Sequence, residues 1–123
     1  MSFQLECFDH VQLAAPCNGE EQAIAFYQGI LGMELIDKPE PLRKNGGVWF
    51  QARSLQIHVG IEDPFKPSRK AHPAIRVQHL QELKNRFVLS QINVIEDQLL
   101  PGANRFYVVD PFGNRLEFLE WKI

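Results

Sequence analysis

The sequence predicts an α+β fold of two similar βαβββ modules whose strands form a curved mixed-sheet cleft. Two patterns indicate it: segments of alternating polarity, which are typical of strands with one exposed face, and the same order of segments occurring twice. The chain length of 123 residues suits one compact domain with a hydrophobic core. We expect a single domain over residues 1–123, with module one at about 5–62 and module two at about 71–123.

The first module begins with a predicted strand over residues 8–14, whose side chains alternate between two faces. Asn18 is then expected to cap a helix, with Glu21 bonding back to it as in a capping box. An apolar stripe at helical spacing follows, and Gly29 and Gly32 are the predicted end of the helix. Strands are predicted after it at residues 33–36, 47–52 and 55–61.

The second module repeats this order, with a strand at 72–77 and a helix at about 79–89. Between its last two strands, Pro111 fixes φ and Gly113 permits a positive φ, which predicts a tight turn. The Pro-rich and basic segment 62–70 is expected to be the loop that joins the modules. The remaining predicted strands are residues 92–95, 106–110 and 114–121, and the other long loop is 37–47.

Four side chains of metal-ligand type occupy matching positions in the two modules. His10 and His72 lie near the start of the first strand of each module, and His58 and Glu117 lie in the last strand. The separations agree closely, since 58 − 10 = 48 and 117 − 72 = 45. Packing about a pseudo-two-fold axis would bring the four together, and three imidazoles with a carboxylate suit one Fe, Mn, Ni, Co or Zn ion. The alternative is ordinary hydrogen bonding, with Glu117 paired to an arginine.

The polar faces of the same strands are expected to line a small-molecule pocket, because a concave polar sheet is a typical ligand site. Lys66, Arg69 and Lys70 form a basic cluster before His72. It is either a solvated loop or a binding site for a carboxylate, phosphate or glutathione-like substrate. The aromatic side chains nearby supply either pocket walls or core. The pocket candidates are Gln12, Gln56, Arg69, Arg76, Tyr107 and Arg115.

Composition excludes several classes of function. The net charge of −2 argues against nucleic-acid binding, which needs a basic surface. No uncharged stretch is long enough to span a bilayer, and no secretory signal is recognised, so Cys7 and Cys17 are expected to be reduced in a cytoplasmic protein. Glycine-rich phosphate loops, Gly-x-Ser-x-Gly and paired Cys-x-x-Cys motifs are absent from the sequence, which argues against nucleotide binding, serine hydrolysis and zinc ribbons.

Residues 9–11 (Asp-His-Val), 72–75 (His-Pro-Ala-Ile) and 110–118 (Asp-Pro-Phe-Gly-Asn-Arg-Leu-Glu-Phe), together with the repeat, resemble the vicinal oxygen chelate superfamily. This group includes glyoxalase I, fosfomycin-resistance thiol transferases, extradiol dioxygenases and bleomycin-resistance proteins. The resemblance covers nearly the whole chain, and it implies that His10, His58, His72 and Glu117 are the metal ligands. His58 departs from the glutamate usual in glyoxalase I. The resemblance also implies a homodimer with sites built from both chains.

Two functional hypotheses follow. The favoured one is a divalent-metal-dependent enzyme that acts on a small oxygen-chelating substrate, with Glu117 as the catalytic base and glyoxalase-like lyase or isomerase chemistry. Thiol transfer and extradiol dioxygenase chemistry remain possible within this hypothesis. The alternative is a non-catalytic protein that sequesters an antibiotic or metabolite, as in the bleomycin-resistance branch.

Overall fold

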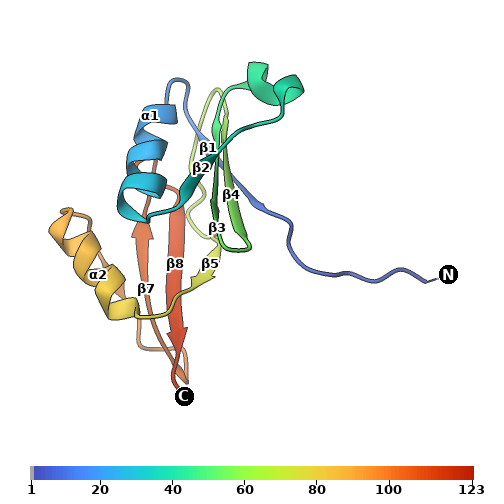
Figure 1. Ribbon diagram of the computed structural model, residues 1–123. Helices are drawn as coiled ribbons and strands as arrows, with labels where there is room; N and C mark the ends of the chain where they lie inside the picture. Colours follow the sequence, from blue (N-terminus) through green and yellow to red (C-terminus); the bar gives the residue numbers. More distant parts are fainter. Residues whose placement is uncertain (1) are drawn as a thin grey trace.

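Two four-stranded mixed sheets, one from each half of the chain, form the framework of the computed structural model, which describes residues 2–123 (Figure 1). The strand order is β1-β4-β3-β2 in the first sheet and β5-β8-β7-β6 in the second. The predicted α+β class with two βαβββ halves is therefore confirmed. The strands are β1 Val11–Ala15, β2 Glu34–Ile36, β3 Val48–Ala52, β4 Leu55–Ile61, β5 Ala74–Arg76, β6 Ile95–Glu96, β7 Ala103–Val109 and β8 Arg115–Trp121.

In each half, the first strand lies at the edge of its sheet and runs parallel to the last strand. β1 pairs with β4 so that Gln12 lies opposite His58, and β5 pairs with β8 so that Ala74 lies opposite Glu117. The other strand pairs are antiparallel. His58 and Glu117 therefore lie in β4 and β8, whereas His10 and His72 lie just before β1 and β5 and not in the strands predicted to contain them.

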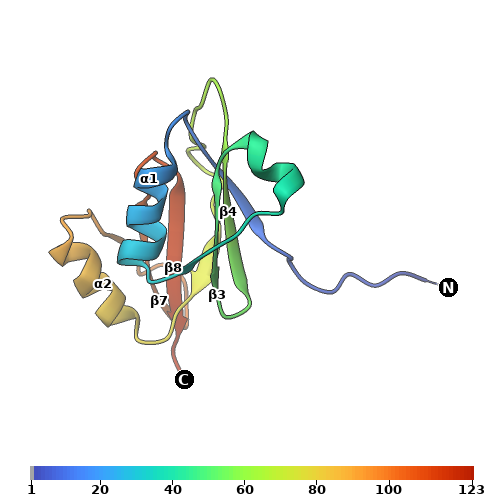
Figure 2. The same cartoon turned by 45° about the horizontal axis from the view of Figure 1, so that its top comes forward.

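The two main helices cover the same side of both sheets, as two views of the ribbon show (Figures 1 and 2). The first begins as α1 (Glu20–Ala23) and continues as the π-helical segment η1 (Ile24–Ile30), and the second is α2 (Leu80–Leu89). The ring of Phe26 in η1 lies 6.1 Å from that of Phe87 in α2. One buried core therefore joins the halves beneath the helices, with Tyr27, Phe50, Phe87, Phe106 and Phe118 among its largest members.

The start of the first helix differs from the prediction. Its N-cap residue is Gly19, which makes no side-chain cap hydrogen bond, and Asn18 adopts a φ of 67° one position earlier. The predicted capping box is therefore wrong. The helix also continues through Gly29, so that only Gly32, with a φ of 74°, follows its end.

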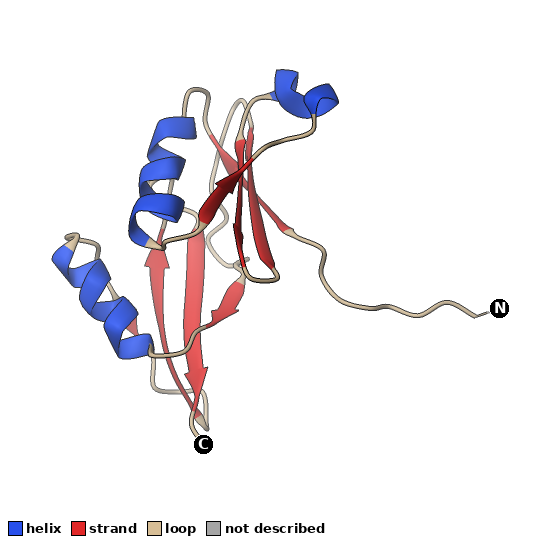
Figure 3. Ribbon diagram, viewed as in Figure 1, coloured by secondary structure: helices blue, strands red, loops and turns tan. Residues whose placement is uncertain are grey.

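Several strand bounds also differ, because a strand extends only as far as a partner strand is present. Residues 8–10 pair with no strand among residues 2–123, and the N-terminal segment that leads to β1 extends away from the two sheets (Figure 3). β7 begins at Ala103, earlier than predicted, because β8 pairs with it along its full length. The predicted strand at 92–95 is reduced to Ile95–Glu96, and the predicted loop 37–47 contains a short 3₁₀ helix, η2 (Glu40–Asn45).

Within residues 2–123, none of the helices combines the length and the apolar composition that a membrane crossing requires.

Candidate functional site

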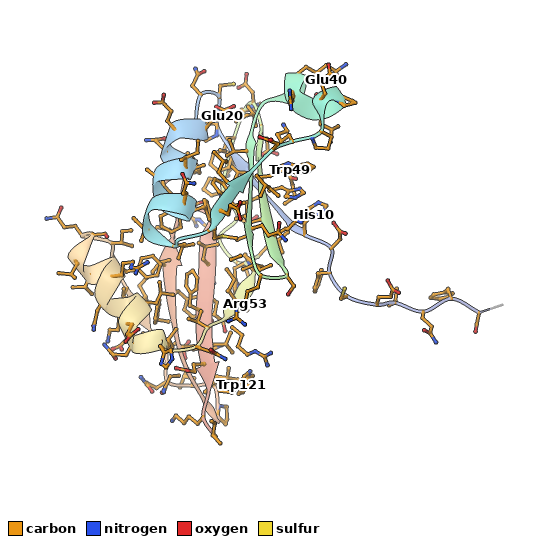
Figure 4. The ribbon with its side chains drawn as sticks, viewed as in Figure 1. His10, Glu20, Glu40, Trp49, Arg53 and Trp121 are labelled. Atoms are coloured by element: carbon orange, nitrogen blue, oxygen red, sulfur yellow. The ribbon has the colours of Figure 1, made fainter. Side chains whose placement is uncertain are left out.

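The first half of the chain places three rings in a stack on the sheet face opposite the helices. The imidazole of His58 lies between His10, with ring centroids 4.0 Å apart, and Trp49, at 3.8 Å (Figure 4 labels His10 and Trp49). His58 is buried. This burial, and next the neighbouring His10, lower the pKa of His58 below its ordinary value of 6.5. His58 is therefore neutral near pH 7, the form that binds metal ions.

The orientation of His10 is set by its neighbour in the sequence. Its Nδ1 atom lies 2.9 Å from a carboxylate oxygen of Asp9. Because a carboxylate only accepts hydrogen bonds, Nδ1 carries the proton, and in the neutral ring Nε2 keeps its lone pair. A carboxylate that holds the second nitrogen in this way is typical of histidines that bind metals.

The second half brings His72 and Glu117 together across 45 positions of sequence. Nε2 of His72 lies 2.9 Å from Oε1 of Glu117, and Nδ1 of His72 lies 2.8 Å from the carbonyl oxygen of Lys70. Glu117 is buried, with 5% of its surface exposed. The carbonyl of Lys70 only accepts, so Nδ1 is the donor there, and Nε2 faces the carboxylate.

This contact needs a proton or a metal ion between Nε2 of His72 and Oε1 of Glu117. With the proton on Nδ1, a neutral His72 would direct a lone pair at a buried carboxylate, which is unfavourable. A proton on either atom, or a metal ion between them, removes the repulsion. The pair is therefore suited to share a proton or to hold a metal ion, and Nη1 of Arg105 lies 3.5 Å from the other carboxylate oxygen of Glu117.

Tyr107 lies beside this pair on β7, directly opposite Glu117. Its ring packs edge-on against His72, with centroids 5.4 Å apart, and the guanidinium of Arg115 lies 4.2 Å above it. Burial, and next the charge of Glu117, raise the pKa of Tyr107 above 10.0. The phenol is therefore a neutral hydrogen-bond donor at physiological pH.

The structure brings the four predicted ligands together as two pairs. His10 lies with His58 and His72 lies with Glu117, but within residues 2–123 no three His, Cys, Asp or Glu side chains are close enough to hold one metal ion. The four-ligand site within one chain is not formed by this packing. The combined ligand set remains a prediction.

The predicted pocket residues lie in four different places. Arg69, Tyr107 and Arg115 line one cavity of about 550 Å³, whereas Arg76 lines a different one of about 790 Å³. Gln56 contacts His58, with its Oε1 atom 3.0 Å from Nε2 of the imidazole. The amide of Gln12 instead donates to the carbonyl of Leu13.

Arg105 is a site residue that the sequence analysis missed. It bridges Glu117 and Asp97, and its Nη2 atom lies 3.3 Å from the Asp97 carboxylate. Strand alternation would have placed it on the same face as Tyr107. It was overlooked because the strand was predicted to begin at residue 106, one position beyond it.

Comparison with known proteins agrees with this fold. A family model described as the glyoxalase/bleomycin resistance protein/dioxygenase superfamily matches residues 8–118. The chain belongs to this superfamily. The match covers most of the chain, so the resemblance seen in the sequence is confirmed at the level of the superfamily. No curated protein matches the sequence significantly.

Several solved structures have the same fold. A protein from Bacillus anthracis assigned to the glyoxalase family is 48% identical, with a TM-score of 0.96 over 99% of this chain and 100% of that one. A fosfomycin resistance protein from Listeria monocytogenes is 18% identical, with a TM-score of 0.78 over 98% and 97%. Lactoylglutathione lyase from Agrobacterium tumefaciens is 20% identical, with a TM-score of 0.69 over 89% and 91%. The two distant structures share the fold.

Proposed function

We propose that this chain is a divalent-metal-dependent enzyme acting on a small substrate that presents oxygen atoms for chelation, with glyoxalase-like lyase or isomerase chemistry. The observation that carries the proposal is the His72–Glu117 pair, whose Nε2 and Oε1 atoms lie 2.9 Å apart with Nδ1 already engaged. A metal ion can take the place of the proton between these two atoms. A manganese-bound structure of the Listeria fosfomycin resistance protein supports a metal in this superfamily.

We further propose that each metal is held between two copies of the chain. His10, with its Nδ1 oriented by Asp9, would contribute Nε2 from one copy, and His58 beside it is the fourth candidate ligand. The His72–Glu117 pair would come from the other copy. β1 and β5, next to these residues, are both edge strands with an unpaired side, so both are available to a second chain.

The chemistry follows from the residues around the pair. A bound divalent metal would act as a Lewis acid toward the substrate oxygens. Glu117 is the carboxylate available to take up and return a proton, and it is the proposed catalytic base. The Tyr107 phenol, kept neutral by burial, would donate a hydrogen bond to a substrate oxygen. Thiol transfer and ring cleavage would use the same residues, so the reaction type must be found by assay.

Metal content measured by mass spectrometry tests the proposal. Protein purified without chelators and then offered Fe, Mn, Ni, Co and Zn is expected to retain about one ion per chain. Glu117→Gln and His10→Ala should each lose it, whereas His79→Ala should keep it, because His79 is an exposed residue at the start of α2. If no ion is retained at stoichiometric level, the enzyme hypothesis is wrong and the non-catalytic binding protein is favoured.

Co-expression of two defective variants tests whether the site lies between chains. In an equal mixture of His10→Ala and Glu117→Gln subunits, half of the dimers are mixed. Each mixed dimer has one intact site and one doubly defective site, so about a quarter of the wild-type metal content should return. A site within one chain predicts that none returns.

A further inference from the structure

The cavity of about 550 Å³ next to the His72–Glu117 pair is lined by cationic side chains from two directions. Lys66 and Arg69 come from the loop that joins the halves, and Arg115 comes from β8. Among the described residues that line this cavity there is no Asp or Glu. The whole chain carries a net charge of −2, so this positive charge is a local feature and not the general character of the surface.

The three cations also lack carboxylate partners elsewhere. Among residues 2–123, the ion pairs include none with Lys66, Arg69 or Arg115. The nearby carboxylates, Asp97 and Glu117, both pair with Arg105. No ion pair within residues 2–123 neutralises these three side chains, which favours an anion from outside.

Arg115 is held in a defined position at the cavity. Its guanidinium lies 4.2 Å over the ring of Tyr107, and its Nη1 atom donates to the carbonyl oxygen of Arg69 at 3.4 Å. A guanidinium has five N–H donors in a planar fork, so most of them remain available to a ligand. This fork suits the paired oxygen atoms of a carboxylate or a phosphate.

The loop that carries the other two cations is anchored to the turn before β8. Pro67 packs closely against Gly113. A Cβ atom added to Gly113 would lie 3.1 Å from Cγ of Pro67, and Gly113 has a φ of 94°. Phe65 also packs edge-on against Phe112, with centroids 6.5 Å apart. Lys66 and Arg69 are therefore presented to the cavity by a loop with fixed contacts.

We infer that this cavity binds an oxyanion group of the substrate, a phosphate, phosphonate or carboxylate, while other oxygen atoms of the same molecule reach the proposed metal. The inference rests on the proposed function, because Tyr107 links the two places. The centre of its ring lies 5.4 Å from that of His72 and 4.2 Å from the guanidinium carbon of Arg115. Because one side chain contacts both places, we expect a small substrate with few atoms between its anionic group and its chelating oxygens.

Binding of simple anions to protein stripped of metal with a chelator tests the inference separately from the metal. The probes are methylphosphonate, acetate and the uncharged dimethyl methylphosphonate, measured by calorimetry. We expect saturable binding of one or both anions and none of the neutral ester. Arg69→Gln and Lys66→Gln should each weaken binding about tenfold, as expected for loss of one charge-assisted hydrogen bond. Both residues are exposed, so these variants should fold.

Lys70→Gln is the matched control, because Lys70 is the exposed neighbour of Arg69 but does not line the cavity. It should change anion affinity no more than about twofold, since an exposed charge away from the ligand is screened. An equal loss in this control would show general attraction and overturn the inference. Absence of anion binding in a chain that binds metal would overturn the inference and leave the proposed function standing. Anion binding by a wild-type chain that takes up no metal ion would support the anion site and overturn the proposed metal site.

Discussion

Replacing Tyr27 by phenylalanine removes one hydroxyl group from the core and tests how the two halves of the chain are joined. The Tyr27 hydroxyl donates to Oδ2 of Asp110 at 2.7 Å, across 83 positions of sequence. Both residues are buried, with exposures of 0% and 3%. Asp110 also accepts hydrogen bonds from its own turn, namely from the backbone N–H groups of Phe112 and Asn114 and from the Asn114 side chain.

The expected loss in the free energy of unfolding is about 2 kcal/mol, within the 1.5–3 kcal/mol typical of a hydrogen bond to a charged group. The three remaining donors still form hydrogen bonds to the Asp110 carboxylate, so a loss of about 3 kcal/mol is not expected. Urea unfolding near pH 7 measures this loss in the free energy of unfolding. With a denaturant slope of about 2 kcal/mol/M, the midpoint should fall by about 1 M. A double-mutant cycle with Asp110→Asn isolates the pair from other effects of each substitution.

The same variant has a distinct effect at alkaline pH. Burial, followed by the charge of Asp110, raises the pKa of Tyr27 well above 10.0 in the folded protein. Above pH 10 the unfolded chain loses this proton while the folded chain keeps it, so stability should fall by about 1.4 kcal/mol per pH unit. In Tyr27→Phe this part of the fall should disappear. A loss below about 0.5 kcal/mol near pH 7, together with an unchanged alkaline slope, would refute the role assigned to this bond.

Three further predictions concern a helix start, a turn and a helix interior. Glu120 on β8 accepts hydrogen bonds from the N–H groups of His79 and Leu80 at the start of α2, which lower its pKa below 4.5. Glu120→Gln should therefore lower the melting temperature near pH 7, and the difference from wild type should shrink as the pH falls through and below 4.5, because the wild-type carboxylate is then lost too. Gly113→Ala should destabilise by about 1 kcal/mol or more, since it combines a positive φ with the contact to Pro67. Gly29→Ala should instead stabilise the folded protein by up to about 1 kcal/mol. Gly29 lies in a helix, and the nearest neighbour of a Cβ atom added there is the carbonyl oxygen of Ile24, at 3.9 Å. Urea unfolding of both glycine variants checks the opposite signs.

The sequence by itself determined the order of the elements and the face on which most site residues lie. Strand β4 has the bounds predicted from alternation, Leu55–Ile61. Alternation also placed His58 and Glu117 on the face away from the helices, where the structure has them against His10 and His72. These features follow from a period of two residues, which is local and visible in any stretch of chain.

Only the tertiary structure decided which side chains meet. It placed His58 between His10 and Trp49, joined Arg105 to both Asp97 and Glu117, and brought Lys66 and Arg69 opposite Arg115. It also kept the two ligand pairs apart within one chain, whereas the matching spacings of the two halves had suggested one group of four. The physical reason is that the repeat sets each residue's place within its own module. The distance between modules depends instead on how the shared aromatic core packs and on whether a second chain is present.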